Sequence, residues 1–184
     1  DDSLLLDLQA GIKPHAMVVL MNQLGTRANL LSREELRPLI RERVDKHGWL
    51  YQAGKKVSHM SNYLGQGRTM SESILKDSCK ELPEDLSSFA PLLVSPAECS
   101  RLQDRCYFAR YWGVREWHGR VRRWLLDSGE FVSESGSRRL FLGKRLRAGG
   151  DVDRKTWGDA LAHEPQLNTT LAALLAIWRL WTDP

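Results

Sequence analysis

Residues 96–126 read PAECSRLQDRCYFARYWGVREWHGRVRRWLL and form the longest stretch of the chain with a helical pattern of apolar residues. Apolar residues recur mostly at steps of three and four, the spacing of one helix face, at Leu102, Cys106, Ala109, Trp117, Val121 and Trp124. We therefore expect one face of this segment to lie in the core. Gly113 and Gly119 are candidate positions for a bend, and Gly129 ends the pattern.

Helical patterns also dominate the sequence on both sides of this segment. Ser32, followed by Glu34 and Glu35, is a typical helix start. Further helices are predicted over residues 3–9, 14–20, 33–47, 55–64, 69–80 and 151–163, and Pro165 interrupts the pattern after the last of these. A final helix carries an apolar stripe at Leu167, Leu171, Leu174, Leu175, Trp178 and Trp181. Residues 130–134 and 138–142 have strand character around a Ser-Gly-Ser turn. The sequence thus predicts a mainly α (α+β) fold with one small β-hairpin, and the Pro-rich residues 83–97 are expected to form a surface connection.

Composition narrows the class of protein. The chain has 184 residues, of which 42% are hydrophobic and 27% charged, so it suits one domain with a core, or one domain with a small appendage, and is neither collagen-like nor disordered. Cys79, Cys99 and Cys106 form no CxxC pair and leave an odd thiol, which favours a reducing, intracellular setting. No apolar run reaches the roughly 20 residues of a membrane span, so we predict no membrane partner.

The first residues, DDSLLLDLQAG, begin inside an amphipathic pattern, without an initiator methionine. They also lack the basic region and cleavage site of a signal peptide. We expect the sequence to be a piece of something longer.

Charge is distributed unevenly along the chain. Residues 101–147 carry twelve basic and five acidic residues, a balance of +7, so the remainder carries −3 of the total of +4. Eleven of the twelve are arginines, which suit bidentate phosphate contacts, and aromatic residues lie between them. The alternative is a solvated basic helix face whose aromatic residues belong to the core. The glycines beside Arg138, Arg139 and Lys144 in the hairpin region favour nucleic acid, because glycine lets backbone approach phosphate closely.

Residues 55–68, KKVSHMSNYLGQGR, carry the most informative functional pattern. Lys55, His59 and Tyr63 are four residues apart and so share one helix face. A cation, an imidazole and an aromatic ring in one row suit a nucleoside triphosphate. The alternative is an ordinary amphipathic surface, and His15 is likewise either a phosphate donor or a structural histidine. The histidines and cysteines have no zinc spacing, so we predict no structural metal.

The order of these motifs resembles the region between the two catalytic motifs of family-A DNA polymerases. DSLLLDLQAGIKPHAMVV is similar to the stretch that precedes the fingers, and KKVSHMSNYLGQG is similar to the fingers helix with its Arg-x3-Lys-x3-Phe/Tyr row. YWGVREWHGRVRRWLLDSGEFVSESGSRRLFLGKR resembles the long helix, strand and Gly-Arg-Arg hairpin. ALAHEPQLNTTLAALLAIW is similar to the Pro-x-Gln-small-Thr helix, and together the matches cover about residues 1–182.

The resemblance implies a role for each matched residue. His15, Lys55, His59 and Tyr63 would bind the incoming dNTP, the first three at its phosphates. Arg138, Arg139, Gln166 and Thr169 (or Thr170) would face the DNA. Residues 1–184 would then be a single fingers-like region with parts of the palm, within an enzyme of the bacterial cytoplasm or a phage-infected cell.

Three departures from the family pattern stand out. The family usually carries lysine at the position of His59 and a tyrosine near Gly67. Its acidic ligands for Mg²⁺ belong to an Asp motif before this region and a His-Asp-Glu motif after it, so we expect no catalytic residue and no metal ligand in this sequence. Asp151, Asp153 and Asp159 are interpreted as helix-start or surface acids. Either a longer polypeptide or a second polypeptide would supply the catalytic aspartates.

The sequence thus favours the part of a DNA polymerase that binds dNTP and template–primer for nucleotidyl transfer in replication or repair. Two alternatives stay open. One is a non-enzymatic helical module that binds nucleic acid, supported by the +7 stretch and the missing carboxylates. The other is a helical scaffold.

Overall fold

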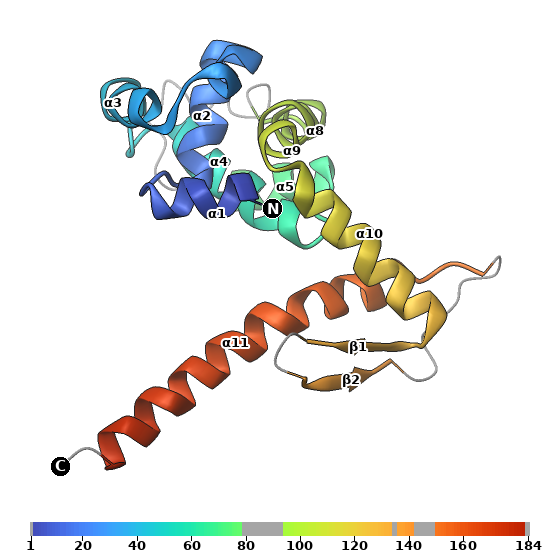
Figure 1. The fold of residues 1–184 in the computed structure, drawn as a ribbon. Coiled ribbons are helices and arrows are strands. Elements are labelled where there is room, and N and C mark those ends of the chain that lie inside the picture. The colour runs from blue at the N-terminus through green and yellow to red at the C-terminus, as the bar shows by residue number, and fades with distance from the viewer. Residues whose placement is uncertain (1, 79–93, 134–135, 142–149, 183–184) are drawn as a thin grey trace. The chain divides into compact units, whose positions relative to one another are not determined.

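The computed structural model describes residues 2–78, 94–133, 136–141 and 150–182 (Figure 1). These residues are mostly helical and include one two-stranded antiparallel sheet, so the predicted fold class is confirmed. The chain forms two compact units, residues 1–116 (unit 1) and 117–184 (unit 2), which are described separately. Most of residues 83–97, the predicted Pro-rich connection, lie outside the described residues.

Unit 1 is built from short helices. In chain order they are α1 (Asp2–Gln9), α2 (Pro14–Leu24), the 3₁₀ helix η1 (Gly25–Leu30), α3 (Arg33–Arg43), α4 (Trp49–Asn62), α5 (Gly67–Ser78), α8 (Pro96–Leu102), the π-helical turn η2 (Gln103–Tyr107) and α9 (Phe108–Arg110). The unit boundary falls within α10 (Trp112–Asp127).

Helix α2 lies at the centre of unit 1. Residues 16–21 are all apolar and all buried, which is typical of a helix surrounded by protein on every side. It packs against α4, η1, η2 and α3. Gly54 allows α4 to approach it closely, because a Cβ at that position would lie 2.9 Å from the carbonyl oxygen of His15.

The helix ends follow local capping signals, with some shifts from the predicted bounds. The Ser32 hydroxyl accepts from the Glu35 N–H while the Glu35 carboxylate accepts from the Ser32 N–H, a complete capping box at the start of α3. That helix ends at Arg43 rather than near His47. Helix α4 begins directly after Gly48, several residues before the predicted start at Lys55.

The prediction that one face of residues 96–126 lies in the core is only partly correct, because the segment is not one regular helix. The π-helical turn η2 inserts extra backbone, and Tyr111, with φ −110° and ψ 55°, breaks the helix before α10. Each change rotates the residues that follow, so Ala109 is exposed and Trp124 is 46% exposed. The break lies at Tyr111 and not at either of the expected glycines.

Asp7 of α1 is the most connected buried polar residue described in unit 1, and its side chain is 0% exposed. Its carboxylate accepts from Arg33 Nε of α3 at 3.0 Å and from the Arg110 guanidinium at 2.7 and 2.8 Å. The Tyr111 hydroxyl donates to it at 2.9 Å. Burial and the neighbouring carboxylate raise the pKa of Tyr111, while the hydrogen bond to Asp7 raises the pKa of Arg110. One carboxylate thus joins α1, α3 and the end of α9.

Unit 2 contains the hairpin and the longest described helix. Strands β1 (Glu130–Val132) and β2 (Arg138–Leu140) pair antiparallel with Phe131 opposite Arg139, at the predicted place but shorter. Helix α11 (Arg154–Thr182) is capped by Asp153, whose carboxylate accepts from the backbone N–H of Lys155 at 3.0 Å. The Trp157 indole N–H donates to the His118 carbonyl at 3.0 Å and ties α11 to α10.

The prediction that Pro165 interrupts the final helix is wrong. Helix α11 is continuous through it, although a proline removes one backbone hydrogen bond. The Thr169 hydroxyl donates to the Pro165 carbonyl at 2.8 Å, and the strong helix formers of residues 171–177, LAALLAI, continue the helix. Most of the apolar stripe expected on this helix is exposed, including Leu174, Leu175, Trp178 and Trp181.

Among the described residues, no single helix is long and apolar enough to cross a membrane. One pair, Asp2–Gln9 with Pro14–Leu30, reaches the necessary length and composition together, and it is bent by 105°.

Replacing Asp7 with asparagine should lower the free energy of unfolding by about 3–5 kcal/mol, because it leaves the largely buried Arg110 without its counter-charge. Asp104→Asn is the matched control. Its partner is Arg115, both side chains are 56% exposed, and the loss should stay below about 1 kcal/mol. Urea denaturation of the three proteins measures the difference. Equal losses in the two variants would contradict the central role of Asp7.

Candidate functional site

Helices α2 and α4 bring two of the predicted phosphate-binding residues together. His15 Nε2 and the Tyr51 hydroxyl share a hydrogen bond of 2.9 Å, and the two rings meet edge to face at 4.7 Å. Lys55, one turn after Tyr51, places its Nζ 5.3 Å from the centre of the Tyr51 ring, a cation–π distance. His15 and Lys55 are therefore joined through a tyrosine that the motif analysis did not include.

His15 is neutral at neutral pH. Burial lowers its pKa to about 4, with further lowering by the charges of Lys13 and Lys55. Toward a phosphate it therefore offers no positive charge and one hydrogen bond, from Nδ1–H in the tautomer whose Nε2 accepts from the Tyr51 hydroxyl. The positive charge of this cluster comes from the two lysines, which are both exposed.

His59 and Tyr63 follow Lys55 along α4. His59 is exposed, and its ring meets the Tyr63 ring edge to face at 5.2 Å. Tyr63 is the residue that ends the helix, because Leu64 adopts a left-handed conformation with φ 61° directly after it. The predicted row is thus helical at Lys55 and His59, with Tyr63 at the helix boundary.

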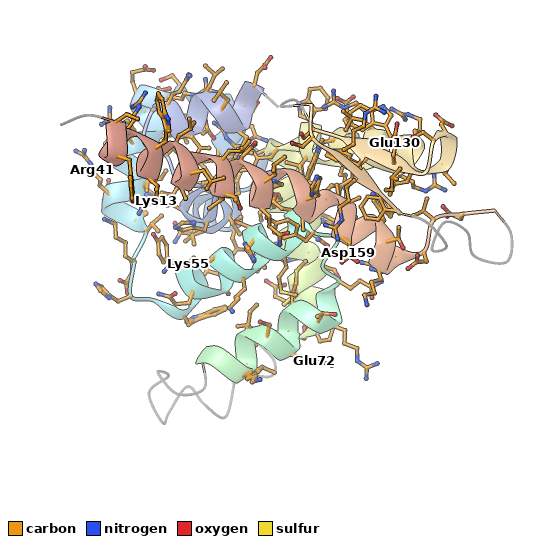
Figure 2. All side chains as sticks on the ribbon, turned by 90° about the horizontal axis from the view of Figure 1, so that it is seen from below. Lys13, Arg41, Lys55, Glu72, Glu130 and Asp159 are labelled. Carbon is orange, nitrogen blue, oxygen red and sulfur yellow. The ribbon has the colours of Figure 1, made fainter. Side chains whose placement is uncertain are left out.

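A cavity of about 240 Å³ lies next to this cluster and shares Tyr51 with it. Four of its lining residues are basic, Lys13, Arg37, Arg41 and Lys46. Figure 2 shows Lys13, Arg41 and Lys55 on one side of unit 1, while Glu72 of α5 lies away from them. The motif analysis missed these basic residues. The spacing of Arg37 and Arg41, one helical turn apart in a predicted helix, was the available signal.

Gly67 has a packing role. A Cβ at this position would lie 2.2 Å from the Pro96 carbonyl oxygen and 2.3 Å from the Ser100 hydroxyl. The first residue of α5 therefore leaves no room for the tyrosine ring that the polymerase family carries near this position.

The predicted DNA-facing residues all lie in unit 2. Arg138 and Arg139 are exposed on β2, and the Arg139 guanidinium lies 5.1 Å from the centre of the Phe141 ring. Gln166 is exposed on α11, and the hydroxyls of Thr169 and Thr170 donate to backbone carbonyls of their own helix at 2.8 and 3.0 Å. The neighbouring Lys144, Arg145 and Arg147 lie outside the described residues.

Internal pairing uses part of the positive charge of residues 101–147. Arg101 binds Glu98, Arg110 binds Asp7 and Arg122 binds Asp151, all carboxylates from outside that stretch. Most of the interleaved aromatic residues are buried: Tyr107, Phe108, Tyr111, Phe131 and Phe141. Exposed tryptophan rings remain at Trp112 and Trp124. The linear count therefore overstates the charge and the rings that can face a nucleic acid.

Two acidic residues of unit 2, Asp151 and Asp153, have structural partners. Asp151 accepts from Arg122 Nε at 2.9 Å, and Asp153 caps α11. In the part of the chain that the structure describes, no three histidine, cysteine, aspartate or glutamate side chains gather as a metal site would require. The Mg²⁺ ligands expected outside this chain stay a prediction.

No protein-family model, no curated protein and no solved structure matches this chain. The resemblance to family-A DNA polymerases therefore depends on the motifs alone.

The pKa of His15 provides a direct test of this cluster. We expect the ring to titrate near pH 4, and Lys55→Ala to move the midpoint upward, since it removes a nearby positive charge. NMR titration of the His15 ring measures both, with Lys76→Ala on α5 as the control that changes net charge equally. A midpoint near 6.5 in the unmodified protein would contradict the buried contact with Tyr51.

The same shift predicts how stability depends on pH. The unfolded chain protonates this histidine near pH 6.5 and the folded chain only near pH 4, so protonation favours unfolding as pH falls between these values. The difference in Tm between the unmodified protein and His15→Gln should therefore decrease from pH 7.5 to pH 5. A difference independent of pH would contradict this expectation.

Proposed function

We propose that this chain is the nucleotide-binding, fingers-like part of a family-A-like DNA polymerase. The observation that carries the proposal is the cluster on α2 and α4, where His15, Tyr51 and Lys55 are in contact and His59 is exposed one turn further along the same helix. A hydrogen-bond donor, an exposed lysine and an exposed imidazole from two tightly packed helices suit the phosphates of a dNTP.

Each residue has a defined task in this proposal. Lys55 neutralises phosphate charge, and His15, as a neutral imidazole, directs one hydrogen bond. His59 binds the phosphates next to Lys55. Tyr63 packs on the sugar or base, and its ring contacts that of His59. The reaction served is attack of a primer 3′-hydroxyl on the α-phosphate of the dNTP, and these side chains bind and orient the nucleotide for it. In that family Mg²⁺ stabilises the charge that develops on the phosphates.

The second candidate function is a helical module that binds nucleic acid without catalysis. It is supported by the exposed arginines of unit 2, among them Arg120, Arg123, Arg138 and Arg139, together with the exposed Trp124. Such side chains suit a phosphate backbone and stacked bases. The two candidates differ in whether the chain binds dNTP.

Removing the phosphate-binding groups of α4 should weaken dNTP binding. A hydrogen bond to a charged group contributes about 1.5–3 kcal/mol, so Lys55→Ala and His59→Ala should each raise the Kd for dNTP about ten- to one-hundredfold. Isothermal titration calorimetry at neutral pH and low salt measures the change.

Lys76→Ala, at an exposed site on α5, is the control and should change the Kd less than twofold. If the chain binds DNA but has no measurable affinity for dNTP, the module is favoured and the polymerase proposal fails. Equal effects of all three variants would also contradict the assigned site.

DNA binding by unit 2 should depend on salt through its arginines. Each phosphate contact adds about 0.9 to the slope of log K against log salt, so Arg138→Ala/Arg139→Ala should reduce the slope by up to about 1.8. Fluorescence anisotropy with a labelled primer–template duplex measures it. Arg68→Ala/Lys76→Ala on α5 removes the same charge elsewhere and serves as the control. An affinity that ignores salt would favour a scaffold over both candidate functions.

A further inference from the structure

The basic cavity of unit 1 is a second place where this chain concentrates positive charge. Its cations come from three segments: Lys13 directly before α2, Arg37 and Arg41 on α3, and Lys46 in the connection to α4. None of the residues that line it is acidic. Asp45 lies between two lining residues in the chain but does not line the cavity itself. Its carboxylate accepts a hydrogen bond from the His47 N–H at 2.9 Å.

This arrangement has an energetic cost in the absence of an anion. Arg37 and Arg41 stand at i and i+4 of one helix, where like charges repel, and Lys13 and Lys46 line the same cavity. A bound anion would offset all of these terms.

The remaining walls strengthen such binding. Ile12, Val44 and the Tyr51 ring line the cavity, and all three side chains belong to buried residues. Apolar walls lower the local dielectric and so strengthen an ion's interaction with the cations at the rim. The cavity thus combines four exposed cations with apolar walls.

Size defines the class of ligand. Pockets for drug-sized ligands usually measure about 300–1,000 Å³. At about 240 Å³ the cavity is smaller than this range, which suits one or two phosphate groups better than a whole nucleotide. Guanidinium groups at adjacent turns match the paired oxygens of a phosphate.

We propose that the cavity formed by Lys13, Arg37, Arg41 and Lys46 binds a pyrophosphate group, either as the free ion or as the terminal phosphates of a nucleotide. The site is distinct from the Lys55–His59 face of α4 and meets it at Tyr51. It does not depend on polymerase activity, although pyrophosphate is also what nucleotidyl transfer releases.

The test is calorimetric titration of the full chain with sodium pyrophosphate at neutral pH and low salt. Arg37→Ala/Arg41→Ala should raise the Kd at least tenfold, and Lys46→Ala should raise it by a smaller factor. Arg68→Ala/Lys76→Ala removes the same two charges from exposed sites on α5 and should change the Kd less than twofold. All four substituted arginine and lysine sites of the double variants are exposed, so both double variants should fold like the unmodified protein.

A second measurement locates the bound ion. Pyrophosphate near Lys13 should raise the pKa of the His15 ring, which NMR detects, and this response should be lost in Arg37→Ala/Arg41→Ala. No binding by the unmodified chain, or equal weakening in both double variants, would overturn the proposal.

Competition between dNTP and pyrophosphate shows whether the cavity takes the free ion or the phosphates of a nucleotide. A variant of α4 then distinguishes the cavity proposal from the proposed function. A dNTP that displaces pyrophosphate identifies terminal nucleotide phosphates as an occupant, whereas a dNTP that does not displace it identifies the free ion. Lys55→Ala/His59→Ala should keep pyrophosphate binding while losing dNTP affinity. Loss of pyrophosphate binding in that variant would place the ion on α4 and overturn the cavity proposal without affecting the proposed function.

Discussion

The architecture of unit 1 depends on one buried carboxylate. Asp7 accepts hydrogen bonds from Arg33, Arg110 and Tyr111, residues that are 26, 103 and 104 positions away in the chain. A buried charge is tolerated only when its partners satisfy it, so α1 is held where α3 and α9 both reach it. Since α3 carries two of the four cations of the basic cavity, this network also helps to position the walls of that site.

The close packing of α2 and α4 positions the nucleotide-binding candidates in a similar way. Without a side chain at Gly54, the backbone of α4 approaches His15, which then reaches the Tyr51 hydroxyl and lies near Lys55. The same burial that fixes the imidazole also keeps it neutral, so the architecture assigns the charge to the lysines. The contact between α2 and α4 therefore sets both the position of the His15 ring and its protonation state.

The sequence predicted the class of fold well because the signals involved are local. Ser32 with Glu35 and the turn around Gly136 each act over a few residues, and each lies at an element boundary where expected. The sequence-based prediction failed where an irregular turn changes the orientation of the residues that follow it, and at a proline that a helix tolerates. A π-helical turn and the break at Tyr111 rotate the face of residues 96–126, and α11 continues through Pro165.

The sequence by itself determined the helical content, the hairpin and the spacing that puts Lys55 and His59 on one face, because periodicity and capping are properties of adjacent residues. Only the tertiary structure decided which charges are available. Arg110 and Arg122 bind carboxylates 103 and 29 positions away in the chain, while four other cations converge on one cavity from three segments. Such pairings join residues far apart in the chain, and no local pattern records them.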